Sequence, residues 1–152
     1  MEYPAINKIL AAVCERLQKI SDPAAPAQPL LREIRTACIT GYENLFALLP
    51  DLTAFPAAIV AAGNLSFPEM ATVREVELAV IIIDEFRASP ELAVAGYDLV
   101  DRFAGCLTGS FPGAALELGG VHFITEGIQP LELDGDHTGW QYTLKATAGF
   151  LS

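Results

Sequence analysis

The stretch Val73-Arg74-Glu75-Val76-Glu77-Leu78-Ala79-Val80-Ile81-Ile82-Ile83 decides the fold of this chain. In its first half charged and apolar residues alternate, which predicts a strand with one solvent-exposed face. Its second half, Ala79–Ile83, is apolar at every position, as is typical of a central strand covered on both sides. We therefore expect residues 73–83 to form the central strand of a layered domain, with Glu75 and Glu77 together on one face.

Three further strands are expected around this one. The apolar run at 57–63 predicts a buried strand, and a loop should follow it from Asn64 to Ala71. Residues 121–126 are expected to form another strand, followed by a long polar loop from Gly127 to Gly139. From Trp140 to Ala148 apolar and polar residues alternate, which predicts a half-exposed strand.

Two helices are predicted, one before the first of these strands and one between the strands at 73–83 and 121–126. Residues 4–20 repeat apolar side chains at three- and four-residue spacing, and Pro4 suits the first turn of a helix. A second helix is predicted from Ser89 to Gly109, because Ser89 can cap its start and Gly109 can end it in the left-handed conformation.

The N-terminal third is less regular. Three prolines within residues 22–29 stop any helix and predict a stiff, extended connector. The pattern of residues 30–49 allows two interpretations: helical pieces, or a short strand at Thr36–Thr40. The whole chain, 1–152, is predicted to be a single α+β domain, with a mainly antiparallel or mixed sheet of about four strands flanked by two or three helices. Its parts are an N-terminal helix (1–21), the Pro/Ala connector (22–29) and a sheet–helix core (57–148).

The charge of the chain is unevenly distributed. The net charge is −10, but residues 1–50 carry equal numbers of acidic and basic groups. Residues 51–152 hold four basic and fourteen acidic groups, which accounts for the whole imbalance. Such a surface repels the phosphate backbone, so we expect no direct binding of nucleic acid. Acidity that only keeps the protein soluble is an equally open interpretation.

The cysteines and the N-terminus indicate a cytoplasmic protein. Cys14, Cys38 and Cys106 are odd in number and far apart, which favours reduced thiols over a disulfide framework. The N-terminus has no basic region followed by an apolar stretch, so we expect no signal peptide. The apolar runs are shorter than the ~20 residues that a membrane helix needs.

Catalytic motifs are missing from the sequence. Neither GxxxxGK[ST] nor GxGxxG occurs, and Ser110 does not lie in a GxSxG elbow. His122 is expected to be a packed or edge histidine. His137 lies near Asp134 and Asp136, but the three are better explained as a solvent-exposed loop than as a metal or catalytic site. We therefore expect no enzyme, no cofactor and no metal.

Four segments in order carry a resemblance to a known family. These are the strand ending in Ala79–Ile83, the segment Ala95-Gly96-Tyr97-Asp98-Leu99-Val100-Asp101-Arg102-Phe103, the turn Leu107-Thr108-Gly109-Ser110-Phe111-Pro112, and the strand segment Gly139-Trp140-Gln141-Tyr142-Thr143-Leu144. The order and spacing of these segments over residues 57–148 resemble the tail completion, or tail terminator, proteins of Mu-like phages and prophages.

The resemblance implies a structural role in the virion. Proteins of this family are small α+β proteins that form a ring, commonly a hexamer, on the end of the tail tube. They stop tube polymerisation and offer the surface to which the head attaches, so the implied partners are other copies of the chain, the tail tube protein and the head–tail connector proteins. The implied location is the host cytoplasm and then the virion tail. A neck or connector subunit would fit nearly as well.

Two sets of residues are candidates for this role. The apolar side chains of the two expected loops, at 64–71 and 128–137, would contact the tube or a neighbouring subunit: Phe67, Met70, Leu131 and Leu133. Folding of these side chains back onto their own domain is an equally open interpretation. A second set of carboxylates would form an acidic wall that keeps DNA from sticking in the channel: Glu75, Glu77, Asp134 and Asp136. Two alternatives from other classes stay open. One is a small-molecule-binding or regulatory α+β domain with an apolar pocket between helix and sheet, and the other is an enzyme with an unfamiliar site around His137.

Overall fold

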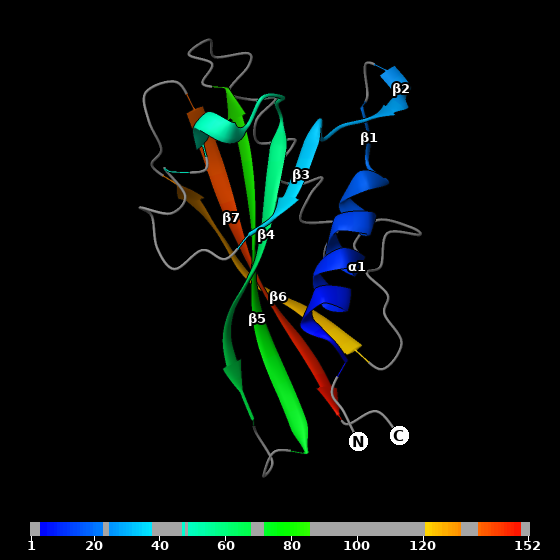
Figure 1. Ribbon diagram of the computed structural model, residues 1–152, viewed down its shortest axis with the longest axis vertical. Coiled ribbons are helices and arrows are strands. Elements are labelled where there is room, and N and C mark those ends of the chain that lie inside the picture. The colour runs from blue at the N-terminus through cyan, green and yellow to red at the C-terminus, as the bar shows by residue number, and fades with distance from the viewer. Residues whose placement is uncertain are drawn as a thin grey trace.

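The protein folds around one long, strongly twisted sheet with a helix along one side (Figure 1). The computed structural model describes residues 4–22, 25–37, 47, 49–67, 72–85, 121–131 and 137–149. The sheet contains β3 (Glu33–Thr36), β4 (Ala57–Ser66), β5 (Val73–Glu85), β6 (Val121–Leu131) and β7 (His137–Gly149). The helix is α1 (Ile6–Gln18), and the smaller elements are β1 (Ser21–Asp22), β2 (Ala25–Pro29) and the 3-10 turn η1 (Leu49–Asp51).

The strand order is β3-β4-β5-β7-β6, so β5 is central. All neighbours in this sheet are antiparallel except β3 and β4, which are parallel. The central place of residues 73–83 and the mixed sheet were both predicted from the sequence. The number of strands differs from the prediction, because β3 adds a fifth strand to the expected four, while the described residues contain one α-helix.

The two halves of β5 differ in their surroundings. Its even-numbered residues, Val76 to Ile82, face α1 on what we call the helix face, in one buried cluster with Tyr142 and Leu144. On the opposite face, here called the second face, Ile81 and Ile83 lie in another buried cluster. The sheet from Val80 to Ile83 is therefore covered on both sides, as the apolar run predicted, whereas Ala79 is half-buried. Complete burial of one valine, leucine or isoleucine side chain stabilises the fold by about 1.5–3 kcal/mol.

The cluster on the second face has contributions from several elements. Leu49 and Leu52 come from η1 and the residue after it, and Leu131 comes from the end of β6. Ala57 and Ile59 of β4 complete it beside β5.

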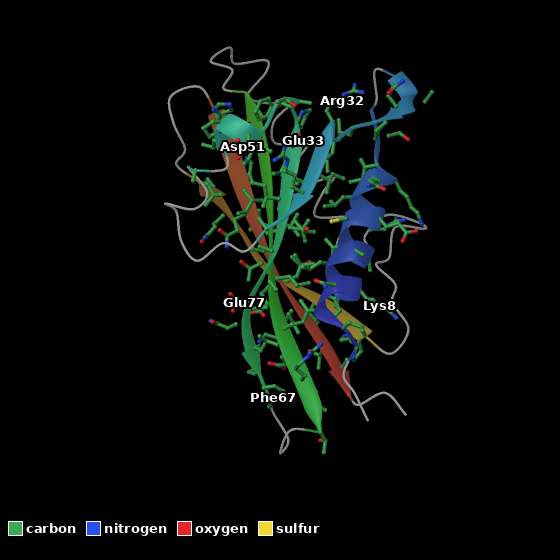
Figure 2. All side chains as sticks on the ribbon, viewed as in Figure 1. Lys8, Arg32, Glu33, Asp51, Phe67 and Glu77 are labelled. Atoms are coloured by element: carbon green, nitrogen blue, oxygen red, sulfur yellow. The ribbon has the colours of Figure 1, made fainter. Side chains whose placement is uncertain are left out.

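The first predicted helix is confirmed, since α1 lies within residues 4–20. Ile9, Val13 and Leu17 are buried against the sheet, while Lys8 is exposed on the outer side (Figure 2). The start of α1 is tied to the sheet, because the Arg74 guanidinium of β5 donates a hydrogen bond to the carbonyl of Pro4.

The described part of the connector, Asp22 and Ala25–Pro29, is extended, as predicted. The prediction did not include the pairing of β2 with β1, which is antiparallel. Prolines exclude a helix here, as expected, but they permit edge strands, in which a missing N–H group costs no ladder hydrogen bond.

Two strands continue into segments that the sequence predicted to be loops. β4 extends to Ser66, through residues 64–66 of the first predicted loop. β6 extends to Leu131, through residues 127–131 of the second. The expectation fails because Asn64, Gly127 and Pro130 have low strand propensity. Pairing with β5 and β7 overrides this local preference.

The ambiguous segment 30–49 contains a strand, β3, which begins three residues before the Thr36–Thr40 alternative and shares Thr36 with it, while residues 38–40 lie outside the described residues. The predicted helix from 89 to 109 lies outside the described residues, as do two of the four segments that carry the family resemblance. In the part of the chain that the structure describes, no helix is long and apolar enough to cross a membrane.

Candidate functional site

The second face of the sheet becomes polar beyond its buried cluster. Glu75 and Glu77 occupy alternate positions of β5 on this face, as the sequence predicted. Lys145 of β7 is directly opposite Glu77 in the strand register. Figure 2 places Glu77 on the side of the sheet away from Lys8 and α1. We call this region, made of Glu75, Glu77, Glu126 and Lys145, the polar patch.

Lys145 links two of the three carboxylates of the polar patch. Its ammonium group lies 3.2 Å from Glu126 Oε1 and 3.7 Å from Glu75 Oε2. The hydrogen bond and the charge of Glu126, followed by the charge of Glu75, raise the pKa of Lys145 above its ordinary value. These are solvent-exposed ion pairs, which contribute little to stability. Three carboxylates around one ammonium leave the patch with negative charge.

Sequence reasoning did not assign Glu126 to this cluster. The register of β6 against β7 shifts between Thr125 and Gly127, and Glu126 is the residue in that β-bulge. Ile124 is opposite Lys145 in the register, so alternation along β6 puts Glu126, two residues later, on the second face beside Lys145. This contact depends on the register of β6 against β7, which no local pattern in the sequence shows.

Small residues of β4 lie next to the patch. The hydroxyl of Ser66 donates a hydrogen bond of 3.2 Å to Glu75 Oε2. A β-carbon added at Gly63 would lie 3.4 Å from Glu77 Oε1, an ordinary contact distance, so Gly63 lies directly beside this carboxylate. The patch therefore spans β5, β7 and β6, and β4 borders it.

The predicted contact residues have different surroundings. Phe67, directly after β4, is 51% exposed (Figure 2). The prediction that Leu131 is a contact residue is wrong, because Leu131 is only 7% exposed and packs in the buried cluster of the second face. Its burial follows from the extension of β6, which turns an expected loop residue into a strand residue facing the core. Met70, Leu133, Asp134 and Asp136 lie outside the described residues.

The residues considered for chemistry do not converge in the described part of the molecule. The rings of His137 and Phe55 lie 5.0 Å apart, and His122 is exposed on β6. Burial raises the pKa of the Cys14 thiol, which favours the less reactive protonated form. Among the described residues, no three His, Cys, Asp or Glu side chains are grouped so that they could hold a metal ion.

A cavity of about 460 Å³ lies between the end of α1, the β1–β2 pair and β3. Its polar lining includes Gln18, Gln28, Arg32 and Glu33, of which Glu33 already forms an ion pair of 3.1 Å with Arg35. The cavity is the described feature closest to the pocket that the small-molecule alternative needs, although its lining is more polar than the apolar pocket expected.

The edges of the sheet are the remaining candidate surface. Two apolar side chains of β6 are exposed, Ile124 by 48% and Ile128 by 37%, and Leu65 of β4 is 45% exposed. Such side chains on an edge strand are typical of a protein that pairs or packs with another chain.

Comparison with known proteins adds no family to this description. No model of a known protein family matches the chain, and no characterised protein matches it in sequence. The resemblance to tail terminators therefore depends on the four sequence segments alone, of which Ala79–Ile83 and Gly139–Leu144 lie in strands β5 and β7 of the described structure.

Proposed function

We propose that this chain is a structural assembly protein, a tail terminator or tail completion subunit of a phage or prophage. In this role it caps the tail tube as a ring of identical subunits and provides the surface to which the head joins. Its partners are further copies of itself, the tail tube protein and the head–tail connector proteins.

The observation that carries this proposal is the apolar surface at the strand edges of a strongly acidic protein. The net charge of −10 keeps separate molecules apart. Nevertheless Leu65, Ile124 and Ile128 expose their side chains on β4 and β6. A protein that works by assembly needs such local apolar contacts on an otherwise repulsive surface.

The polar patch fits the wall of a DNA channel. Its three carboxylates and one ammonium repel phosphate, so DNA would pass without binding. Asp134 and Asp136 belong to the same proposed wall. An electron microscopy reconstruction of the assembled ring tests this part, and Glu75 and Glu77 on the outer rim would contradict it.

The decisive experiment is deletion of the gene from the phage or prophage that carries it. We expect the lysate to contain filled heads and separate tails, with joined particles restored by the gene in trans. Electron micrographs of the lysate provide the measurement. Normal numbers of complete virions after deletion would show that the proposed function is wrong.

The cavity beside β3 favours a second candidate, a small-molecule-binding or regulatory domain. Gln18, Gln28 and Arg32 offer hydrogen-bonding groups around a space of about 460 Å³, within the usual range for ligand sites. Binding of a polar metabolite would raise the melting temperature, and Gln28→Leu would reduce that rise. A metabolite panel that leaves the melting temperature unchanged would argue against this candidate.

A further inference from the structure

The described sheet leaves two stretches of strand edge without a neighbouring strand. β6 pairs with β7 on one side only and ends the sheet. On the other side, β3 pairs with Ala57–Val60 of β4, so Ala61–Ser66 extends beyond it (Figure 1). In the part of the molecule that the structure describes, no strand pairs with the outer side of either stretch.

These stretches lack the features that protect the edge at β3. β3 is four residues long and carries Glu33 and Arg35, which form an ion pair. Short length and charge both discourage pairing with another chain. By contrast, Ala61–Ser66 and Val121–Thr125 contain no residue with a formal charge at pH 7, with His122 counted as neutral.

We infer that these two edges pair with each other between copies of the chain. Val121–Thr125 of one copy adds to Ala61–Ser66 of the next copy and continues the sheet. The directions match, because the successive antiparallel pairs β4–β5, β5–β7 and β7–β6 make β6 antiparallel to β4. This inference rests on the proposed function, since it names the contact through which the ring subunits join.

The side chains of the two edges also fit a second copy. On the helix face, the exposed Leu65 of one copy would meet Phe123 of the other, which is only partly buried. On the second face, Ile124 would lie over the small residues Ala61 and Gly63. No formal charge would oppose another within the paired segments, which matters for a chain of net charge −10.

The geometry of the edges favours a closed assembly. The register of β4 shifts between Ala62 and Leu65, and that of β6 shifts between Thr125 and Gly127. Such bulges bend a strand and increase its twist. A contact between two different edges is head-to-tail, and it produces a ring when the rotation between copies closes.

The first experiment places a charge on each edge of the full-length protein. Ile124→Lys blocks the β6 edge and Leu65→Lys blocks the β4 edge, while Gln18→Lys on the exposed end of α1 is the control with the same change in charge. By size exclusion with light scattering, we expect the wild type and the control at several times the 16.2 kDa protomer mass. Each edge variant should elute as a monomer. A wild type that stays monomeric at every concentration would overturn the inference.

Mixing the two edge variants gives a sharper result. Ile124→Lys keeps an intact β4 edge and Leu65→Lys keeps an intact β6 edge, so an equimolar mixture should form a heterodimer of twice the protomer mass. This gain of association also shows that both variants are folded. A mixture that stays monomeric would contradict the inference, as would Leu65→Lys alone forming a dimer, which would indicate symmetric pairing of two β6 edges.

The inference and the proposed function can fail separately. Rings that persist in both edge variants would exclude this contact and leave the tail role intact. Conversely, heterodimers from the mixture combined with normal virions from the deleted phage would support the strand pairing and refute the tail role.

Discussion

Leu131 and Phe67 have the same role in the sequence-based prediction and opposite surroundings in the structure. Leu131 is buried in the cluster of the second face, whereas Phe67 is largely exposed at the end of β4. Removing a buried leucine loses its transfer free energy and leaves a cavity. Removing an exposed side chain loses much less.

We therefore expect Leu131→Ala to lower the free energy of unfolding by about 2–5 kcal/mol. Phe67→Ala should lower it by less than about 1 kcal/mol, because about half of this side chain is already in water. Urea unfolding followed by circular dichroism measures both. Equal losses for the two variants would contradict the assignment of Leu131 to the core.

Lys145 provides a second prediction for single residues. Its pKa is raised mainly by Glu126 and less by Glu75, so Glu126→Gln should lower the titration midpoint of Lys145 more than Glu75→Gln does. NMR titration of the lysine side-chain signals measures this. A raised folded pKa stabilises the protein fully below the unfolded pKa of lysine, ~10.4. The contribution is lost as the pH rises through the folded pKa. Equal midpoints in all three proteins would contradict the cluster geometry.

At the scale of the elements, strand β4 changes its character along its length. Ala57–Ala61 are buried, whereas Gly63–Ser66 are exposed. Gly63 has no side chain to pack and allows the unfolded chain more conformations than alanine would.

We expect Gly63→Ala to raise the free energy of unfolding by about 0.4–1 kcal/mol. The added β-carbon would meet the flexible end of Glu77 at an ordinary contact distance, so no strain offsets the gain. Chemical denaturation measures the change, and Gly63→Pro, which adds a ring and removes an N–H group, serves as a destabilising comparison. A loss of stability in Gly63→Ala would indicate that the bulge depends on glycine.

Strands with a local pattern could be predicted, and strands held by distant partners could not. β5 and residues 140–148 of β7 are visible in the sequence, because their apolar pattern reflects burial. The last five residues of β6 include Gly127 and Pro130 and lack such a pattern. They are strand because β7 pairs with them, and no short window of sequence contains that information. Glu126 was missed for the same reason, since its place beside Lys145 depends on the register of β6 against β7.

At the scale of the whole molecule, the charge of −10 opposes the contact inferred between copies. Salt screens the repulsion between exposed charges, with a Debye length of about 10 Å at 0.1 M. The contact between Ala61–Ser66 and Val121–Thr125 involves no formal charge, so salt does not weaken it.

We therefore expect self-association to strengthen as NaCl rises from about 0.05 to about 0.5 M, because only the repulsive part is screened. Sedimentation velocity at several salt concentrations measures this, with sucrose of equal osmolality as the control. Association that weakens with salt would indicate that ion pairs hold the copies together.

The two unlike halves of β5 also have a consequence for motion. Val80–Ile83 belong to the two buried clusters on either side of the sheet, whereas Glu75 and Glu77 have water on one side. Local opening is easiest where few apolar contacts must break. Amide protons should therefore exchange with solvent early near Val73 and last near Ile83. The end of the sheet that can fray is the one that carries Leu65 and Ile124, so arrival of a neighbouring subunit would slow amide exchange there while leaving the protected end unchanged.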